Sequence, residues 1–335
     1  MRVSAALPTG VAALFFDSAL RHRKLEEKLV RQLTRGGFSE VILPVVDYLD
    51  PYEAMLGKTA STWVSRDELY RFVDRDGEVL ALRADFTPML ARLIAPRLAS
   101  LDLPLELFYR GDVLRYQEER AGRLRETYQL GAEILGMGGQ EGERRALRQF
   151  LELLGVGERR RLLVVLGFAG ALDRLLLDGA GGDQAAALAA AVMRRERCVA
   201  RERSAALGQV IENGIPDDPA ALGAGAAERL ERLLAFRRDL EAAFPQIELR
   251  VDLAEFADQA LAPELQAGVG PRAYYDGLVF RAFVGAAAEP VGGGGRYDGL
   301  FQRLGADVTA AGFSLSLDRL LGRGREASQS SEEGR

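Results

Sequence analysis

The amino-acid sequence predicts an α+β fold with a mostly antiparallel sheet. Strand-forming segments follow one another at residues 69–83 and 105–135 without room for helical crossovers, which favours antiparallel pairing. A block at residues 183–244 is rich in alanine, leucine and arginine and poor in strand formers. A parallel, doubly wound sheet would instead alternate strands and helices regularly along the chain. We therefore expect a sheet-based domain that is interrupted by a helical insertion.

The composition is typical of a globular protein and does not favour nucleic-acid binding. The chain has 335 residues, about two domains by length, and 48% of them are hydrophobic, enough for a sizeable core. Its formal net charge is −5, whereas proteins that grip nucleic acid usually carry a basic domain or stripe. Arginine clusters at residues 159–161 and 194–197 lie beside acidic residues, so we interpret them as solvated helix faces or turns.

Several reactive residue types are scarce, and their scarcity excludes whole classes of site. The one cysteine, Cys198, excludes disulfide frameworks and cysteine–zinc clusters. The one histidine, His22, falls where leucines repeat at helical spacing, so we interpret it as a helix residue near the buried face rather than a base or a ligand. No lysine follows a glycine-rich phosphate loop, which excludes a P-loop NTPase. We expect no metal and no cofactor.

The sequence shows no targeting or membrane segment. No N-terminal stretch combines a basic start, an apolar core and a cleavage site. No apolar run approaches the roughly 20 residues that a membrane span needs. We therefore expect a cytoplasmic protein without a membrane partner.

Periodicity and turn residues place the regular elements. A helix is expected at residues 15–34, where a pair of glycines closes it. A strand at residues 38–46 contains Pro44, which cannot donate to a strand ladder and so implies an edge or a bulge. An Asp-Gly pair at residues 76–77 predicts a hairpin. The other expected strands are at 69–73, 78–83, 105–116, 126–135, 161–167, 248–253, 273–284 and 289–294; helices are expected at 87–98, 141–154 and 297–304, a helical block broken near 214–219, and a last strand and helix within 310–321.

Residues 82–88 place an acid and a hydroxyl group where a strand gives way to a helix. Thr87 is a good N-cap and Pro88 suits the first helical position, so the segment taken alone is more typical of a helix cap. The functional interpretation is that Asp85 and Thr87 receive the ammonium group of a ligand. Both interpretations stay open on these residues alone.

The strand at residues 126–135 presents a polar face. Gln129, Gly131 and Glu133 point to one side of a strand, because side chains alternate between the two faces. Gly131 would leave room for a ligand over the sheet, and Arg115 at the end of the opposing strand could bind a carboxylate or phosphate with two hydrogen bonds. A solvent-facing polar strand is the alternative, and we favour the pocket.

Glycines and a final arginine mark the C-terminal segments. Tyr274 and Tyr275 precede an apolar strand, and four glycines follow at residues 292–295. Glycines at such a place bring the backbone close to a ligand or to another strand. The last strand, which begins near residue 312, runs into a helix that carries Arg319.

In this order, these segments resemble histidyl-tRNA synthetase, from about residue 8 to residue 321. The resemblance implies a class II aminoacyl-tRNA synthetase-like fold, in which a six-stranded antiparallel sheet is flanked by helices. We expect one domain over residues 1–321, with a helical insertion at about 170–246. The tail at 322–335 is polar and rich in glycine and serine, and we expect it to be disordered. The matching segments are residues 38–47 for motif 1, 115–133 for motif 2, 312–320 for motif 3, 82–87 for the amino-group segment, and Tyr274–Tyr275 with the glycine run for the histidine-specific segment.

The resemblance assigns a histidine pocket to specific positions. The residues that match the family's α-amino contacts are Asp85, Thr87 and Gln129; those around the imidazole are Glu133, Tyr275 and Tyr274; and Arg115 matches the arginine that handles the carboxyl and phosphate groups.

The departures from the family concern catalysis. The motif 2 triplet of arginine, histidine and glutamate is replaced by Arg115, Tyr116 and Gln117. The family's catalytic arginine falls on Gly270, with Arg272 displaced by two positions, and such a fixed charge usually supplies the largest catalytic contribution. We also expect no anticodon-binding domain after the final motif.

A pocket without these activating residues fits the regulatory subunits of ATP phosphoribosyltransferase, a family paralogous to histidyl-tRNA synthetase. The resemblance implies a non-catalytic subunit that binds histidine, assembles with the short-form catalytic subunit and forms a homodimer through residues 38–47. It implies feedback regulation of histidine biosynthesis and no tRNA partner. Two alternatives stay open: a stand-alone amino-acid-activating ligase, for which Arg115 and Arg319 could bind ATP, and a scaffold with a vestigial pocket.

Overall fold

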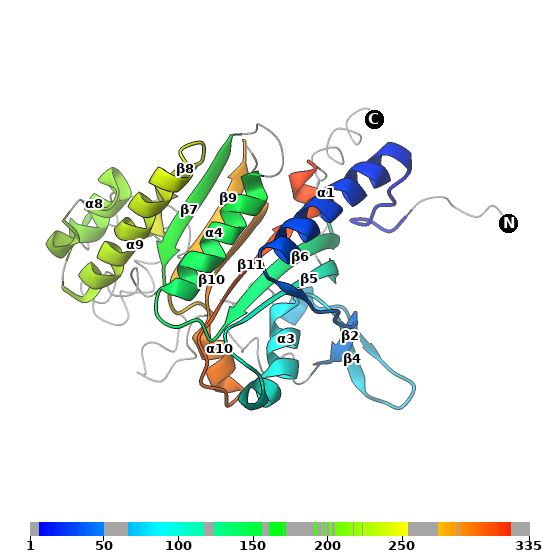
Figure 1. Ribbon diagram of the computed structural model, residues 1–335. Coiled ribbons are helices and arrows are strands. Elements are labelled where there is room, and N and C mark those ends of the chain that lie inside the picture. Colours follow the sequence, from blue (N-terminus) through cyan, green and yellow to red (C-terminus); the bar gives the residue numbers. More distant parts are fainter. Residues whose placement is uncertain are drawn as a thin grey trace.

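An eight-stranded sheet forms the centre of the computed structural model (Figure 1). The strands, in their order across the sheet, are β1 (Ser39–Glu40), β5 (Leu105–Leu114), β6 (Glu126–Leu135), β11 (Ala310–Ser316), β10 (Gly292–Arg296), β9 (Leu278–Val284), β7 (Leu162–Phe168) and β8 (Glu248–Val251). The structure describes residues 7–49, 66–116, 124–155, 161–169, 205–216, 218–222, 224–253, 274–285 and 289–322, with residues 171, 191–192, 196, 198, 201–202 and 287.

The pairing confirms the predicted fold class. From β5 to β7 every neighbouring pair is antiparallel, which gives the six-stranded antiparallel core that the resemblance implied. The two parallel pairs lie at the edges, where β1 pairs with β5 and β8 pairs with β7. The long strands β5 and β6 pair in register from Leu105 opposite Leu135 to Leu114 opposite Glu126.

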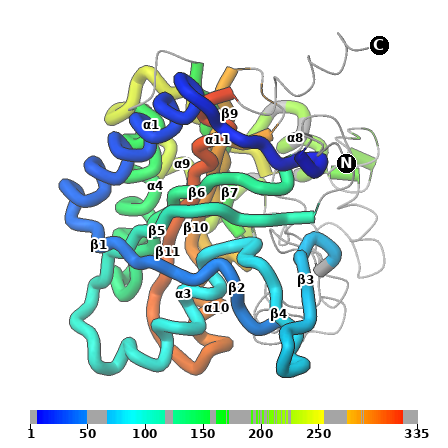
Figure 2. Tube along the Cα trace, turned by 90° about the vertical axis from the view of Figure 1, so that its right-hand side faces the viewer, coloured from blue at the N-terminus to red at the C-terminus, as the bar shows by residue number. Residues whose placement is uncertain are grey.

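Helices cover both faces of this sheet. Alternate residues of β9 show the division, because Phe280 packs in one buried cluster and Val279 in the other. The first cluster contains apolar side chains of α1 (Phe16–Arg35), α4 (Glu141–Gly155) and α9 (Ala224–Ala243). The second contains those of α3 (Thr87–Ile94), the 3-10 helix η2 (Ala95–Ser100) and α10 (Asp298–Arg303). Figure 2 shows α1 and α4 on one side of β5 and β6, with α3 and α10 below them.

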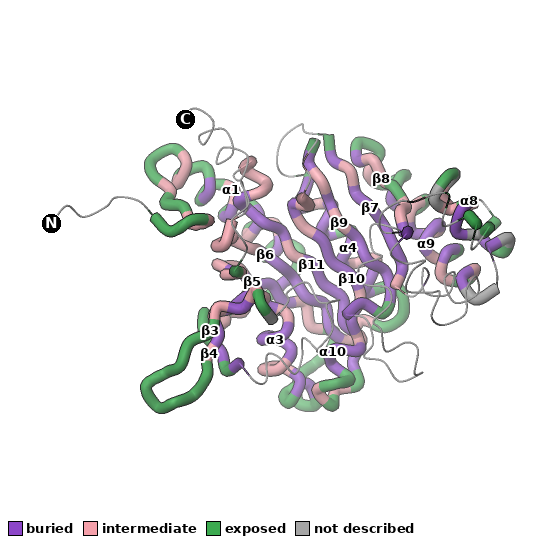
Figure 3. The backbone as a smooth tube through the Cα atoms, turned by 180° about the vertical axis from the view of Figure 1, so that it is seen from behind, coloured by how far each residue is buried: buried purple, intermediate pink, exposed green. Residues whose placement is uncertain are grey.

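A small second sheet contains the predicted hairpin. Its order is β2 (Val46–Tyr48), β4 (Val79–Leu82) and β3 (Arg71–Val73). Gly77 closes the hairpin at a φ of 92°, a left-handed conformation that glycine adopts without steric cost. Figure 3 shows this hairpin exposed, whereas the central strands are buried along most of their length.

The expected strand at residues 38–46 is wrong, because the chain forms two short strands on either side of Pro44. β1 ends at Glu40, and β2 begins at Val46 in the other sheet. The carbonyl oxygens of Leu43 and Pro44 accept hydrogen bonds from the side chain of Arg83 instead of from a strand. Both short strands lie at the edge of their sheets, which confirms the expected edge, and the proline lies in the crossing between the two sheets rather than in a bulge.

Helices occupy the described part of the expected insertion. α8 (Ala205–Asn213) and the 3-10 helix η3 (Pro219–Leu222) precede α9, and the break between α8 and η3 falls at the predicted residues. Leu230 and Leu233 of α9 belong to the same buried cluster as the apolar side chains of α4. The tail beyond residue 322 lies outside the described residues.

The lone histidine behaves as the sequence predicts. His22 lies in α1 on the buried side, and its ring meets Tyr128 edge-on at 4.9 Å between ring centroids. Glu26, one turn further along α1, accepts a 2.7 Å hydrogen bond from the hydroxyl group of Tyr128. Two polar residues on the buried side of α1 therefore contact the sheet through Tyr128.

The packing predicts a large effect of truncating Phe150, which is fully buried on α4. Its ring lies 4.9 Å from that of Phe280 and 5.5 Å from that of Phe313, so removal leaves a cavity between α4 and two strands. We expect Phe150→Ala to lower the free energy of unfolding by about 3–5 kcal/mol in urea titrations. The control is Phe72→Ala on the exposed hairpin, expected to change it by about 0.5 kcal/mol or less. Equal effects of the two variants would contradict this account of the core.

Candidate functional site

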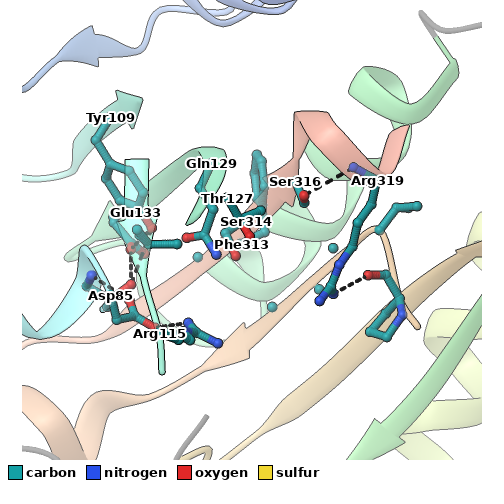
Figure 4. A pocket seen from close by; sticks show the side chains of 18 of the residues that line it. Asp85, Tyr109, Arg115, Thr127, Gln129, Glu133, Phe313, Ser314, Ser316 and Arg319 are labelled. Atoms are coloured by element: carbon teal, nitrogen blue, oxygen red, sulfur yellow. Dashed lines mark hydrogen bonds and ion pairs between the residues drawn. The ribbon is translucent and has the colours of Figure 1, made fainter. Parts of the chain in front are cut away.

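A pocket lies on the face of the sheet that is covered by α3 and α10. Figure 4 shows the side chains that line this pocket. Its cavity volume is about 110 Å³, of the same order as the roughly 150 Å³ cavity that accommodates benzene in a protein interior. The pocket therefore suits a small molecule with one ring. All the residues that the sequence assigned to a ligand site line it: Asp85, Thr87, Arg115, Gln129, Glu133, Tyr274 and Tyr275.

Strand β6 supplies the floor of the pocket. Gln129 and Glu133 face the cavity, whereas Leu130 and Ala132 are buried in the core on the other face. This alternation confirms the predicted orientation of the strand. The alternative of a solvent-facing polar strand is wrong, because Glu133 is only 2% exposed.

The space above Gly131 is filled by protein rather than left for a ligand. A Cβ atom on Gly131 would lie 2.6 Å from the ring of Tyr109, which sits directly across the strand pair. The interpretation that this glycine opens room for a ligand is therefore wrong. It admits an aromatic ring, and the hydroxyl group of that ring donates a 3.0 Å hydrogen bond to Glu133.

Glu133 is a buried carboxyl group surrounded by hydroxyl donors. Its Oε1 accepts from Thr87 Oγ1 at 2.7 Å and from the hydroxyl of Tyr109, and its Oε2 accepts from the hydroxyl of Tyr297. Burial raises the pKa of Glu133 to about 8, although these hydrogen bonds act in the opposite direction. The same burial, together with the charge of Glu133, raises the pKa of Tyr109 and of Tyr297. The carboxyl group can therefore exchange a proton near neutral pH.

Thr87 contributes its hydroxyl group to the pocket rather than to a helix cap. It is the first residue of α3, and Pro88 follows as the second. The N-cap position is held by Phe86, whose side chain makes no capping hydrogen bond, and the Oδ1 of Asp85, one residue earlier, accepts a 2.9 Å hydrogen bond from the backbone N–H of Thr87. The interpretation of Thr87 as the cap is therefore wrong, and Asp85 both orders the turn and lines the pocket.

Arg115 follows β5 and lies beside Asp85. Its Nε donates a 2.9 Å hydrogen bond to the carbonyl oxygen of Ala84, and one terminal nitrogen is 3.5 Å from Asp85 Oδ2. Figure 4 shows the two side chains together at one end of the pocket. This end therefore offers both charges, as the two charged groups of a free amino acid require.

Three tyrosines form an aromatic wall. The ring of Tyr274 meets that of Tyr275 edge-on at 4.9 Å and stacks on that of Tyr297 at 5.5 Å. Tyr275 lies close to Gly295, where an added Cβ would be 2.7 Å from its ring. All three tyrosines line the cavity and are at most 9% exposed.

The glycine run forms strand β10 itself. A Cβ on Gly294 would lie 2.7 Å from the backbone and side chain of Phe313 on the neighbouring strand. One on Gly312, which pairs with Glu133, would collide with the carboxylate of Glu133. Of the two predicted uses of these glycines, close approach to another strand is confirmed, while Gly312 makes room for the buried carboxyl group.

Arg319 lines the opposite end of the pocket and is held by the chain. It lies on α11 (Leu317–Leu320), donates a 2.9 Å hydrogen bond to the carbonyl oxygen of Pro290, and forms a 2.6 Å ion pair with Glu289. Tyr116 is 44% exposed and stands outside the pocket lining. The other positions that depart from the family pattern, Gln117, Gly270 and Arg272, lie outside the described residues.

Two tyrosines of the candidate site, Tyr109 and Tyr297, were not assigned from the sequence. The signal for Tyr109 is a glycine at the centre of a strand, Gly131, because such a glycine commonly receives an aromatic ring from the neighbouring strand. Tyr297 directly follows the glycine strand, but its contact with Glu133 joins residues 164 positions apart. Pattern reasoning along the chain does not reach so far.

Other types of site are not seen in the part of the chain that the structure describes. Its histidine, cysteine, aspartate and glutamate side chains form no group of three or more that could hold a metal ion. Within the same residues, no helix combines the length and apolar character needed to cross a membrane.

Comparison with known proteins relates the chain to one group of sequences. Residues 10–320 match the family model described as histidyl-tRNA synthetase. An ATP phosphoribosyltransferase regulatory subunit from Moorella thermoacetica is 33% identical over 94% of this chain and 81% of its own length. One from an Anaeromyxobacter species is 34% identical over 96% of this chain and 93% of its own length.

Solved structures show the same fold at lower identity. An ATP phosphoribosyltransferase regulatory subunit/histidyl-tRNA synthetase from Bacillus halodurans matches with a TM-score of 0.78 at 21% identity, covering 96% of this chain and 84% of the other. A chain of the ATP phosphoribosyl transferase complex from Thermotoga maritima matches with a TM-score of 0.64 at 20% identity, covering 88% and 97%. Apo histidyl-tRNA synthetase from S. aureus matches at 0.59 and 18%, covering 96% and 71%.

The buried carboxyl group predicts a pH-dependent stability. The folded protein keeps a proton on Glu133 up to a pKa of about 8, whereas the unfolded chain releases it near 4.5. Its contribution is therefore fully present below pH 4.5 and is lost as the pH rises towards 8. We expect the free energy of unfolding to fall by up to about 1.4 kcal/mol per pH unit in this range from this one proton.

Glu133→Gln should remove this slope, because glutamine does not titrate. The measurement is urea unfolding at pH 5.5, 6.5 and 7.5 for both proteins. Glu248→Gln is the control, since arginines lower the pKa of that exposed carboxyl group and its contribution changes only at more acidic pH. An unchanged slope in Glu133→Gln would refute the assignment of a raised pKa to Glu133.

Proposed function

The chain belongs to the histidyl-tRNA synthetase family and, within it, to the ATP phosphoribosyltransferase regulatory subunits, and we propose that its pocket binds free histidine. The regulatory subunit serves histidine biosynthesis, in which histidine is the end product. Binding of the end product would let the subunit report its concentration to a catalytic partner.

One observation carries this proposal: the pocket offers a matching group for each polar part of histidine. Asp85, Thr87 and Gln129 provide oxygen acceptors for the α-ammonium group. Arg115, 3.5 Å from Asp85, provides a cation for the α-carboxylate. The carboxyl group of Glu133 and the ring of Tyr275 are left for the imidazole at the aromatic end of the cavity.

The acid–base properties of Glu133 suit an imidazole ring. Histidine side chains titrate near pH 6.5, and the pKa of Glu133 is raised to about 8. Within this interval a neutral carboxyl group can donate a hydrogen bond to a neutral imidazole, and an ionised one can pair with imidazolium. The pair therefore stays complementary whichever of the two groups holds the proton.

The same polar lining supports selectivity. A site that hydrogen-bonds a ligand group rejects an analogue without that group, because buried partners are then left unpaired. Histidinol lacks the carboxylate that Arg115 would hold, and phenylalanine lacks the ring nitrogens that Glu133 would hold. Both should bind far more weakly than histidine, although both are of similar size.

Assembly with a short-form ATP phosphoribosyltransferase catalytic subunit is the second part of the proposal. The similarity to a chain of the Thermotoga maritima ATP phosphoribosyl transferase complex supports it. Histidine binding would shift this subunit between two conformations, and the catalytic subunit in the complex would respond to that shift. We also propose a homodimer through residues 38–47, which carry exposed apolar side chains such as Ile42 and Val45.

The contacts of Arg319 support binding without activation. Arg319 is already engaged by the carbonyl oxygen of Pro290 and by Glu289. The catalytic arginine of the family is replaced at Gly270. We therefore propose that the chain neither adenylates histidine nor charges tRNA.

Amino-acid activation remains the competing function, because two arginines line the pocket and could bind ATP. Exchange of pyrophosphate into ATP in the presence of histidine separates the two functions. We expect no exchange above background, with a functional histidyl-tRNA synthetase as the positive control. Robust exchange would favour the ligase over the regulatory subunit.

Histidine affinity measured by calorimetry tests the pocket directly. Thr87→Val removes an acceptor for the ammonium group and a donor to Glu133 at nearly constant volume. We expect it to weaken binding by about 5- to 150-fold, since an unpaired buried group costs about 1–3 kcal/mol. Thr34→Val, exposed at the end of α1, is the matched control and should bind as the wild type does. Failure of the wild-type protein to bind histidine would exclude the proposed pocket.

Reciprocal coupling tests the regulatory role. If histidine binding changes the affinity for the catalytic subunit, assembly must change histidine affinity by the same factor, and such couplings are typically about 5- to 150-fold. Calorimetric titration of histidine into the free subunit and into the complex measures this factor. Equal affinities would mean that the catalytic subunit does not sense the pocket, even if the complex forms.

A further inference from the structure

Arg83 is a buried cation that joins three segments of the chain. It is only 4% exposed, yet its guanidinium group must satisfy its donors inside the protein because it does not deprotonate. One terminal nitrogen donates to the carbonyl oxygens of Leu43 and Pro44 at 2.8 and 2.9 Å. Nε and the other terminal nitrogen donate to the carbonyl oxygen of Asp112 at 3.1 and 2.8 Å. The side chain thus links the crossing near Pro44 to the end of β5.

The backbone of Arg83 reinforces the same junction. Its N–H donates to the carbonyl oxygen of Val45 at 2.7 Å, and its carbonyl oxygen accepts from the N–H of Leu114 at 2.9 Å. Arg83 also stands two residues before Asp85 and four before Thr87, both of which line the pocket. The turn that carries these two ligand candidates is therefore fixed from both sides through a single residue.

A stack of flat groups connects Arg83 to the floor of the pocket. The guanidinium group lies 3.9 Å from the centre of the Phe86 ring. The Phe86 ring stacks on that of Tyr109 at 4.3 Å with only 11° between their planes. The hydroxyl group of Tyr109 then donates to Glu133 at 3.0 Å. Arg83, Phe86 and Tyr109 thus form a buried stack that ends on the carboxyl group of the pocket.

Gly111 shows how closely the stack is fitted. A Cβ atom there would lie 2.9 Å from a terminal nitrogen of Arg83 and 3.3 Å from the ring of Phe86. Its φ of 145° is also a conformation that side chains disfavour. The absence of a side chain at Gly111 therefore gives Arg83 and Phe86 the space that they occupy. Because the stack is closely packed, we expect a movement of Arg83 to displace Phe86 and Tyr109.

We propose that Arg83 is a positioning residue of the pocket, through which residues 43–45 set the orientation of Tyr109 and Glu133. The proposal rests on the histidine pocket proposed above and adds a regulatory route to it. Residues 43–45 belong to the segment expected at a subunit interface, so a partner that moves this segment changes the pocket through Arg83. Lysine does not substitute for it, because an ammonium group neither lies flat on Phe86 nor reaches carbonyl oxygens on both sides.

A double-mutant cycle on histidine affinity tests the stack. Arg83→Lys removes the flat group at one end, and Tyr109→Phe removes the hydroxyl group at the other. If Arg83 acts through that hydroxyl group, Arg83→Lys weakens binding about tenfold in the wild-type background, which corresponds to about 1.4 kcal/mol. In the Tyr109→Phe background the same substitution should change the affinity by about threefold or less. A simple loss of stability would instead lower affinity equally in both backgrounds.

The pH dependence of binding gives a second readout. Arg83→Lys should shift the pH midpoint of histidine binding in the same direction as Tyr109→Phe, because both disturb a hydrogen bond to Glu133. Phe86→Leu breaks the stack while keeping Arg83 and an apolar side chain, and it replaces Arg83→Lys in the cycle if that variant does not fold. Additive effects on affinity for the folded variant would overturn the proposal.

Arg145→Lys is the matched control. Arg145 also donates to a backbone carbonyl oxygen of the N-terminal segment, that of Gly36 at 2.7 Å, and lies 4.8 Å from the centre of the Phe38 ring. It is outside the pocket lining, so its replacement should leave histidine affinity unchanged in both backgrounds. If the wild-type protein does not bind histidine at all, the proposed function fails; if it binds and the cycle is additive, only the role of Arg83 fails.

Discussion

A carboxyl group in an apolar interior is the constraint around which the pocket is arranged. Glu133 has almost no contact with solvent, so its oxygens need donors from the protein, and hydroxyl groups of Thr87, Tyr109 and Tyr297 supply them. These donors come from a helix start and two strand regions far apart in sequence. The hydrogen bonds to this one buried carboxyl group therefore connect the helix and strands of the pocket. They also hold the side chains that face the cavity in place.

The sheet accommodates this acid through missing side chains. Gly312 gives up the space that the carboxylate of Glu133 enters, and Gly131 gives up the space of the Tyr109 ring. Gly295 does the same for Tyr275 at the aromatic end. Glycine weakens a strand by conformational entropy and lost packing, yet here each position admits a polar or aromatic group from a neighbour. The glycines in these strands are thus explained by the packing of the pocket rather than by the stability of the sheet alone.

In the function proposed here, the pocket holds a ligand without activating it. Arg319, at the far end of the pocket, is engaged by Glu289 and by the carbonyl oxygen of Pro290. Binding a ligand equally well in its ground state and its transition state does not accelerate a reaction. Such binding can still shift a conformational equilibrium of the protein, if the ligand binds one conformation more tightly than the other. The buried path from Pro44 through Arg83 to Glu133 is a physical connection along which such a difference can be transmitted.

The local periodicity and turn residues of the sequence determined most helices and strands and the antiparallel pairing of the sheet. They also determined that His22 is buried in a helix and that Gln129 and Glu133 point to the same face of their strand. Motif spacing, through the resemblance, selected the residues that the structure gathers around one cavity. Only the tertiary structure decided that Thr87 donates to Glu133 instead of capping α3, and that Tyr109 fills the space above Gly131. It also decided that the crossing at Pro44, between two short strands, gives a carbonyl oxygen to Arg83. Each of these contacts joins segments that are about 20 to 50 residues apart in the sequence. The desolvation of buried polar groups that selects these contacts arises only once the chain has closed around them.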